Sequence, residues 1–500
     1  MKRLSAIILL ACIFTCTAAY AEIRLPSILG SNMVLQRNAD VNLWGTASAG
    51  KTVTAKTSWN GRRYRTKADE AGRWCITVST GEAGGPYTIS ISDGAELLLE
   101  NILLGEVWIC AGQSNMEMPL CGFMYQPVEN SSEHILYSIS ETPGIRLFNV
   151  PRVHSAEPQE DCGGEWQLSC PRNVSTFSAV GYLFGKVLTK AMDGIPVGLI
   201  SANWGGSRIE CWMTEESIDS TPGINHALAK SGTYVTSAPQ WLYNGLIHPI
   251  KDFKAKGIIW YQGCSNRHNW FDYKNLMVSL VKLWRECWQD EDMPFYFTQL
   301  APYTYDGADF RSLPLVIEAQ YQALAELRHS GIAATTDLGS RTCIHPSKKY
   351  EVAARLAYLA LANDYGIDGV PRPAPTYKAM EPVNDERRGN MLLLSFNNLS
   401  ARHSWNEPDS FMAYREEGCP PPGGFEIAGE DKVWYPAKAS YRWWENKIEV
   451  WSENVKNPVA VRYAFRNFPE DANVKTTMGQ PLAPFRTDDW DIEDTGNIDS

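Results

Sequence analysis

The sequence predicts an α/β protein whose mostly parallel sheet, covered by helices on both faces, is flanked by β-rich domains at both ends. First, apolar strand-like segments alternate with helical patterns across residues 105–365, which is typical of a parallel sheet. Second, short β-type segments separated by Gly turns precede and follow this region. Third, a length of 500 residues with 44% hydrophobic and 21% charged residues fits a globular protein of several domains.

Residues 22–104 are predicted to form a β-sandwich-like domain. Segments rich in β-branched and aromatic residues recur here about every ten residues, with Gly-containing turns between them. The expected strands are 40–44, 52–58, 74–78 and 87–92.

Residues 105–365 are predicted to form the α/β domain. The expected strands are 107–111, 196–202, 257–261, 294–300 and 332–336, and the expected helices are 272–288, 316–327 and 347–361. The first helix carries an apolar stripe at helical spacing, formed by Leu276, Leu280, Leu283, Trp284 and Cys287. Catalytic residues of such a sheet are expected on the loops at the carboxyl ends of its strands.

A Pro-punctuated linker at 366–382 is predicted to lead into a second β domain at 383–490. Its expected strands are 391–396, 424–428, 437–441, 447–451 and 459–464. The chain is acidic from Asp488 onward, so we expect it to fray there and to end in a tail at 491–500.

Residues 1–21 are predicted to be a signal peptide. Lys2 and Arg3 are followed by an apolar run at 4–18 and by the small-residue site Ala19-Tyr20-Ala21, which is typical of export with cleavage after Ala21. The apolar run is short for a membrane span. We therefore expect a periplasmic or secreted protein that is not held at the membrane after cleavage.

The charge balance argues against nucleic acid as a partner. Loss of Lys2 and Arg3 moves the formal net charge from −11 to −13, and the chain lacks a basic cluster. Export would permit disulfides among the remaining cysteines, and Cys162 with Cys170 is the expected pair. Neither a CxxC motif nor a zinc-type Cys/His spacing occurs, so no structural metal is expected.

Four motifs that follow predicted strands carry the candidate chemistry. Ser114, in Gly112-Gln113-Ser114-Asn115-Met116, follows a buried strand on a tight turn that would expose Oγ as a nucleophile. For this motif alone, a Ser that caps the following helix is the better explanation. Gly205 and Gly206 follow the strand at 196–202 and could bring backbone N–H groups to a ligand.

The third and fourth motifs supply an amide and an imidazole. Asn266 follows the strand at 257–261 and could donate an N–H to an oxyanion, although for this motif alone an Asx turn is the better explanation. His345 precedes a helix at the mouth of the predicted sheet, where a general base for Ser114 would have to lie.

The order Ser, Gly, Asn, His resembles that of the SGNH hydrolase superfamily. The sequences of the motifs are similar to those of its sialate O-acetylesterase family of carbohydrate esterases. The similar segments are 25–36, Gly105-Glu106-Val107-Trp108, 112–117, 204–212, Ile344-His345-Pro346 and 483–490. The resemblance implies an SGNH/flavodoxin-like sheet and a serine esterase that removes O-acetyl groups from sugars without a metal or organic cofactor. It implies Ser114 as nucleophile, His345 as base, and an oxyanion hole formed by Gly205 or Gly206 with Asn266.

The sequence differs from the family's usual motifs around these residues. Cys264 stands where the family usually has Glu, and Ser340 where a second Asp is common. Thr342 occupies the position, three residues before the His, that often carries the third triad member. Asp337 is therefore the candidate orienter of His345, and a Ser–His dyad held by a backbone carbonyl is the alternative.

The expected substrate is an O-acetylated sialic acid, with acetylated xylan or another plant glycan as the alternative. A noncatalytic glycan-binding protein, motivated by the 18 Trp residues and Cys264, and an esterase of other esters are the competing hypotheses. The oligomeric state, the hydroxyl that carries the acetyl group and the role of the β domains are left open.

Overall fold

The computed structural model describes residues 23–400, 409–411 and 420–492. Its centre is a sheet in the order β13-β12-β11-β7-β10-β8-β9, in which every neighbouring pair is parallel except β8 and β9. The strands are β7 (Glu96–Gly112), β8 (Ile145–Asn149), β9 (Trp166–Leu168), β10 (Val197–Asn203), β11 (Gly257–Tyr261), β12 (Phe295–Thr298) and β13 (Ser330–Ala333). The predicted α/β class with a mostly parallel central sheet is confirmed.

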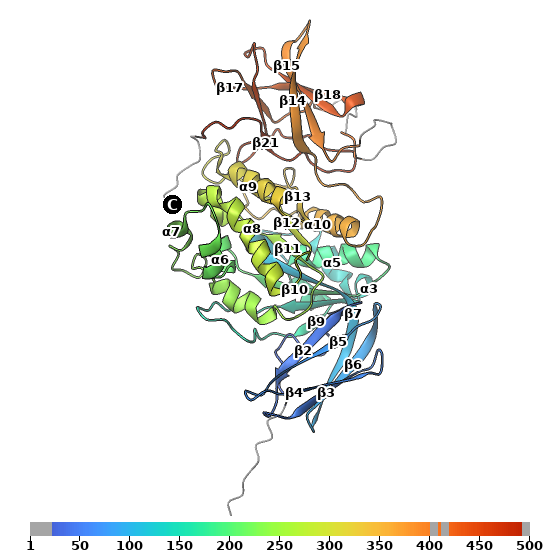
Figure 1. Ribbon diagram of the computed structural model, residues 1–500. Helices are drawn as coiled ribbons and strands as arrows, with labels where there is room; N and C mark the ends of the chain where they lie inside the picture. The colour runs from blue at the N-terminus through green and yellow to red at the C-terminus, as the bar shows by residue number, and fades with distance from the viewer. Residues whose placement is uncertain (1–22, 401–408, 412–419, 493–500) are drawn as a thin grey trace, which may run out of the picture.

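Helices cover both faces of this sheet because its strands are apolar on both sides. The long helices α8 (Trp270–Cys287) and α9 (Ser312–Glu326) pack together on one side, and α5 (Ala179–Ala191) and α10 (Lys349–Asn363) on the other (Figure 1). The shorter helices are α1 (Ser114–Glu117), α2 (Ser131–Leu136), α3 (Ser138–Glu141), α4 (Pro171–Ser175), α6 (Glu215–Ser220) and α7 (His226–Ala229).

The N-terminal β region is joined to the central sheet by one long strand. The first half of β7 pairs with β6 (Gly84–Ser92) and β1 (Val34–Gln36), and its second half pairs with β10 and β11. The remaining strands are β2 (Asp40–Thr46), β3 (Thr52–Thr57), β4 (Arg63–Lys67) and β5 (Arg73–Ser79). Val53 and Ile89 belong to the same buried cluster as Trp108 of the central sheet, so these two regions share one core.

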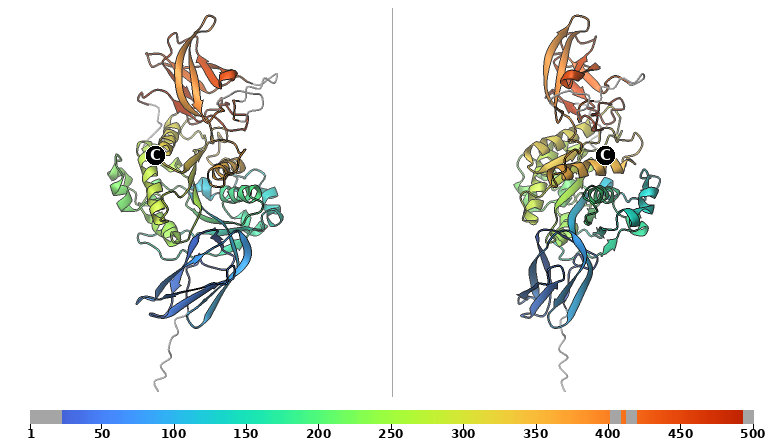
Figure 2. Two further views of the ribbon diagram at one scale, coloured as in Figure 1. Left: turned by 45° about the vertical axis from the view of Figure 1, so that its right-hand side comes forward. Right: turned by 90° about the vertical axis from the view of Figure 1, so that its right-hand side faces the viewer.

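The C-terminal β region has a hydrophobic core of its own. Two four-stranded sheets, β14-β15-β19-β18 and β17-β16-β20-β21, enclose a cluster that includes Leu394, Ile448 and Val461. It lies at the opposite end of the molecule from the N-terminal strands (Figure 2). The strands are β14 (Thr376–Asp385), β15 (Gly389–Asn397), β16 (Phe425–Ala428), β17 (Trp434–Pro436), β18 (Lys438–Arg442), β19 (Lys447–Trp451), β20 (Ala460–Tyr463) and β21 (Phe485–Arg486).

Several boundaries differ from the sequence expectations. β14 begins at Thr376, inside the expected linker 366–382, and β7 crosses the expected boundary between residues 104 and 105 without interruption. The expected fraying does not begin at Asp488, because the fully buried carboxylate of Asp488 forms an ion pair with Arg462, with Nη2 and Oδ1 2.8 Å apart.

The expected disulfide between Cys162 and Cys170 is also wrong. Both thiols are free, and Cys162 Sγ donates to the Gly163 carbonyl at 3.2 Å. The signal peptide predicted at 1–21 and most of the tail predicted at 491–500 lie outside the described residues. Within the described ranges, none of the helices combines the length and apolar character needed to cross a bilayer.

Candidate active site

Three neighbouring parallel strands end at the same level and bring three of the predicted motifs together. In the register of the sheet, Gly112 at the end of β7 lies between Asn203 of β10 and Tyr261 of β11. Gly112 has a φ of +145°, and a Cβ there would lie 2.3 Å from the Tyr261 carbonyl oxygen. Only glycine fits this turn, which is why the chain can leave β7 sharply and present Ser114 at the carboxyl edge of the sheet.

Ser114 and His345 form a hydrogen bond at this edge. The Ser114 Oγ lies 2.8 Å from His345 Nε2, although the two residues are 231 positions apart in the chain. Both side chains are partly exposed, so a substrate can reach them. Burial, aided by the positive charge of Lys349, lowers the pKa of His345 to about 4, and the imidazole is therefore neutral at pH 7, as a general base must be.

The other ring nitrogen of His345 is held by a residue that the sequence analysis missed. His345 Nδ1 lies 2.7 Å from Oε1 of Gln126. An amide oxygen only accepts hydrogen bonds, so Nδ1 carries the ring proton and Nε2 is left free to accept from Ser114. The ring of Phe123 meets the imidazole edge-on, with the ring centres 5.2 Å apart.

A second connection locks the Ser114 segment to the His345 segment. Asn115 Nδ2 donates to the Ile344 carbonyl at 3.0 Å, and Lys349 Nζ donates to Asn115 Oδ1 at 2.6 Å. Lys349 is fully buried, and this burial lowers its pKa to about 7. Asn115 and Lys349 thus hold nucleophile and base in register from the side of α10.

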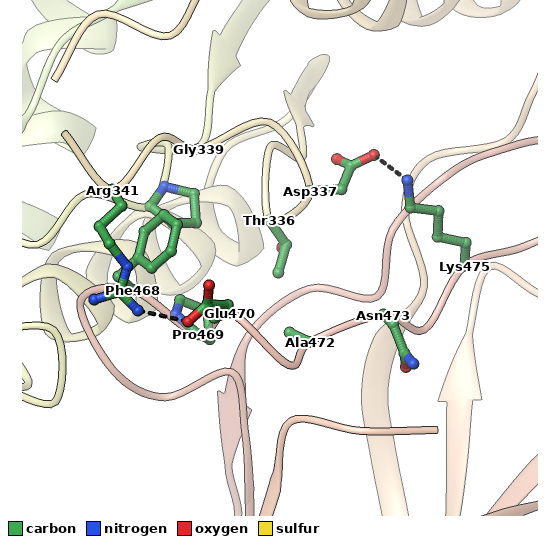
Figure 3. Close-up of a pocket in the computed structure, with 11 residues that line it drawn as sticks. Thr336, Asp337, Gly339, Arg341, Phe468, Pro469, Glu470, Ala472, Asn473 and Lys475 are labelled. Carbon is green, nitrogen blue, oxygen red and sulfur yellow. Dashed lines mark hydrogen bonds and ion pairs between the residues drawn. The ribbon is translucent and has the colours of Figure 1, made fainter. Parts of the chain in front are cut away.

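Asp337, the predicted orienter of His345, has other partners. Its carboxylate forms an ion pair with Arg355, with Oδ1 and Nη1 2.7 Å apart, and a second with Lys475, with Oδ2 and Nζ 2.8 Å apart. Figure 3 shows Asp337 directed toward Lys475. Both residues line a cavity of about 430 Å³ between the central sheet and the C-terminal β region. The alternative of a backbone carbonyl is also corrected, because the acceptor at Nδ1 is the Gln126 side chain.

Gly205 lies beside the nucleophile, as the motif order predicted. A Cβ at Gly205 would lie 3.3 Å from Ser114 Cβ and 2.9 Å from Glu117 Oε2. Gly206 is turned outward in comparison: it is exposed, has a φ of +73°, and its carbonyl accepts from Ser265 Oγ at 2.9 Å. Of the two glycines, Gly205 is therefore the better placed to meet a group bound at Ser114.

Asn266 is fully buried and forms hydrogen bonds within the core beneath the site rather than at its surface. Its Nδ2 donates to Glu210 Oε2 at 2.9 Å and to Asn269 Oδ1 at 3.3 Å, and its Oδ1 accepts from the Ile209 N–H at 2.9 Å. Both amide hydrogens are thus engaged, and the expectation that Asn266 donates to an oxyanion is not met in this structure. A buried carboxylate at Glu210 outcompetes a transient oxyanion for these donors.

Cys264 stands where the family usually has Glu, and its thiol does not supply the negative charge that a Glu side chain would. Burial raises the pKa of its thiol, against the opposing effects of Tyr305, Arg267 and Lys349.

A charged and aromatic surface adjoins the nucleophile. Arg152 forms an ion pair with Glu117 of α1, and its guanidinium lies 5.3 Å from the ring centre of Trp204. His154 stacks on Trp241 at 5.5 Å and meets Trp204 edge-on at 5.7 Å. Arg152 and His154 are exposed and Trp204 is partly exposed, so these rings and charges are accessible beside Gly205.

Comparisons with known proteins agree with this geometry. Residues 104–360 match the family model described as carbohydrate esterase, sialic acid-specific acetylesterase. Sialate O-acetylesterase of Mus musculus is 25% identical, covering 92% of this chain and 94% of the relative. That of Homo sapiens is 27% identical over 72% of this chain and 74% of the relative.

A solved structure is similar over almost the whole chain. The crystal structure of a novel carbohydrate acetylesterase from Xanthomonas citri is 32% identical, has a TM-score of 0.82, and is matched over 94% of this chain and 100% of its own. The SGNH-type fold inferred from the motif order is therefore confirmed.

Proposed function

We propose, from the premise that this chain belongs to the carbohydrate esterase family of sialic acid-specific acetylesterases, that Ser114 is its nucleophile and His345 its general base. The chain is a carboxylic ester hydrolase. The single observation that carries the assignment of roles is the 2.8 Å hydrogen bond between Ser114 Oγ and His345 Nε2.

In the first half of the reaction the acetyl group moves from the sugar to the enzyme. Ser114 Oγ attacks the acetyl carbonyl carbon while His345 Nε2 takes its proton. The C–O bond to the sugar then breaks, and the sugar oxygen receives that proton. In the second half His345 deprotonates a water molecule, which attacks the carbonyl carbon of the acetyl-enzyme. The bond to Ser114 Oγ then breaks, acetate leaves, and Oγ takes the proton back from His345. The backbone N–H groups of Ser114 and Gly205 are the proposed oxyanion donors, since Gly205 lies beside the nucleophile.

The proposed substrate is an O-acetylated sialic acid. The mammalian relatives are named sialate O-acetylesterases. In this chain the half-exposed guanidinium of Arg152 could pair with a sugar carboxylate, and Trp204 offers a ring face to a sugar ring.

An acetylated neutral glycan is the second candidate. Glu117 already pairs with Arg152, so the charge beside Ser114 is balanced before any substrate arrives. The Xanthomonas citri enzyme is named a carbohydrate acetylesterase without reference to sialic acid.

The proposed location is the periplasm or the outside of the cell. The proposal rests on the charged start, the apolar run and the Ala19-Tyr20-Ala21 site at the N-terminus. N-terminal sequencing of the protein recovered from its native host would find Glu22 as the first residue; an intact Met1 would contradict export with cleavage.

The function is tested by acetate release from O-acetylated sialic acids and from acetylated xylan, with p-nitrophenyl acetate as a small reference ester. We expect kcat/KM for the sialic acid esters to exceed that for xylan, and Ser114→Ala to remove turnover of all three while the thermal unfolding midpoint stays near the wild-type value. Preference for xylan would favour the second candidate. Turnover retained by Ser114→Ala would refute the assignment of the nucleophile.

A further inference from the structure

We infer that Gln126 is the positioning residue of His345, replacing the carboxylate of a Ser–His–Asp triad with a neutral amide. The inference rests on the proposed roles of Ser114 and His345, and the contact that carries it joins Gln126 Oε1 to His345 Nδ1 at 2.7 Å. Within the described part of the chain, no carboxylate forms a hydrogen bond with either ring nitrogen of His345.

The loop before Gln126 is built to hold this amide in place. Gly122 has a φ of +83°, and a Cβ there would lie 2.4 Å from the Gln126 carbonyl oxygen, so the loop closes tightly on itself. The Gly122 N–H donates to the Pro119 carbonyl at 2.8 Å, and the Gln126 N–H donates to the Phe123 carbonyl at 2.9 Å. The same turn places the Phe123 ring against the imidazole. Two side chains of one loop thus fix the ring.

A neutral acceptor does part of what a carboxylate does. It selects the tautomer with the proton on Nδ1, which leaves Nε2 able to accept from Ser114. It supplies no negative charge to stabilise the protonated ring. The groups that face His345 agree with this: the cationic Lys349 from α10, the Ser114 hydroxyl and the Gln126 amide, while Cys343 Sγ contacts the His345 carbonyl. His345 therefore stays unprotonated, and competent as a base, well into the acid range.

The matching experiment changes the charge of the acceptor while keeping its shape. In Gln126→Glu, the carboxylate would favour the charged imidazole and raise the pKa of His345 by about 1–3 units. The acid limb of kcat/KM for p-nitrophenyl acetate should move to higher pH by the same amount. Met124→Glu is the matched control, because it places the same charge on the same loop at a side chain that is 79% exposed, where solvent and salt screen it.

Gln126→Ala tests positioning directly. Without the acceptor the ring can rotate and change tautomer, and we expect kcat to fall about 10- to 100-fold, with kcat recovered in Gln126→Glu above the shifted pKa. An acid limb that is the same in Gln126→Glu as in the wild type, or that moves equally in Met124→Glu, would overturn the inference.

NMR titration of the His345 ring separates this inference from the proposed function. The ring signals are assigned by their loss in His345→Ala. A raised pKa of His345 in Gln126→Glu supports the positioning role even if no variant hydrolyses an acetyl sugar, in which case only the proposed function fails. An unchanged pKa refutes the positioning role whatever the activity.

Discussion

The two ends of the segment from Asp337 to His345 are held in opposite ways. At one end, Asp337 is charged and forms ion pairs with the buried Arg355 and the partly exposed Lys475. Arg355 also donates to the Ala334 and Gly479 carbonyls at 2.7 and 3.1 Å. At the other end, His345 is partly exposed and lies between a hydroxyl and a neutral amide.

The difference separates a structural cluster from a reactive one. Lys475 and Gly479 lie between β20 and β21 of the C-terminal β region, so the Asp337 network ties that region to the central sheet. Because the Asp337 carboxylate pairs with Arg355 and Lys475, it is not available to orient His345. The imidazole, in contrast, must take up and release a proton, and its neutral amide partner fixes the tautomer without adding a charge.

The largest expected effect is on activity, at the reactive end. His345→Ala removes the base that takes the Ser114 proton, so kcat for p-nitrophenyl acetate should fall about 10²- to 10⁴-fold. The free energy of unfolding, measured by urea denaturation, should change little because the ring is partly exposed. A lower free energy of unfolding with an unchanged kcat would show that His345, and not Asp337, has the structural role.

The next effect is on stability, at the structural end. Asp337→Asn leaves Arg355 buried without its counter-charge and should lower the free energy of unfolding by about 3–5 kcal/mol at pH 7. The value of kcat should stay within a few-fold of the wild type, since Asp337 does not contact His345. If Asp337→Asn instead lost activity as His345→Ala does, Asp337 would be the triad member after all.

The stability effect should depend on pH in a defined direction. Burial alone would raise the pKa of Asp337, but Arg355 and Lys475 outweigh it and hold the pKa below its usual value. The stabilisation is then fully present above the unfolded-state pKa of about 3.9 and is lost as the pH falls through the lower folded-state pKa. The difference in the free energy of unfolding between the wild type and Asp337→Asn, measured by urea denaturation, should therefore become smaller as the pH falls through that range.

The smallest effect is on the pH profile. The wild-type kcat/KM should be flat through the weakly acid range and fall only near pH 4, the value to which burial and Lys349 lower the pKa of His345. Lys349→Met removes the positive charge, so the pKa of His345 rises and the acid limb moves to higher pH. Lys190→Met, a change of the same charge at a half-exposed side chain, should leave the acid limb in place. A limb that moves to lower pH in Lys349→Met would show that Lys349 acts on His345 through structure rather than charge.

Local patterns predicted most of the elements that build the site. The strands before Ser114 and Gly205 end in register with each other, close to where apolar runs give way to Gly in the sequence. The β8 strand and the α5 helix were not predicted, and β14 begins inside the expected linker. Pro and Gly mark breaks in the chain, but whether a Pro-containing segment pairs at a sheet edge depends on a partner elsewhere in the sequence.

Signals for two of the missed residues were present but weak. Asn115 follows the nucleophile, and Lys349 lies four residues after His345 on a predicted apolar helix; a Lys at a core position is a rare event that marks a buried partner. Gln126 carries no such signal, because a lone Gln on a loop between Phe123 and Pro127 looks like any solvated side chain.

The sequence by itself determined that Ser114, Gly205 and His345 lie at the same edge of the sheet. Parallel strands carry their carboxyl ends to one edge, so motifs that follow these strands lie along it. Because β11 and β12 separate β13 from β7, the loop after β13 brings His345 to Ser114. Only the tertiary structure decided what holds the base. Gln126 and His345 are 219 residues apart, while Asp337 is close to His345 in sequence but faces Arg355 and Lys475. Which acceptor reaches a ring nitrogen depends on how separate loops pack, and the Asp337 carboxylate pairs instead with the two cations that lie next to it.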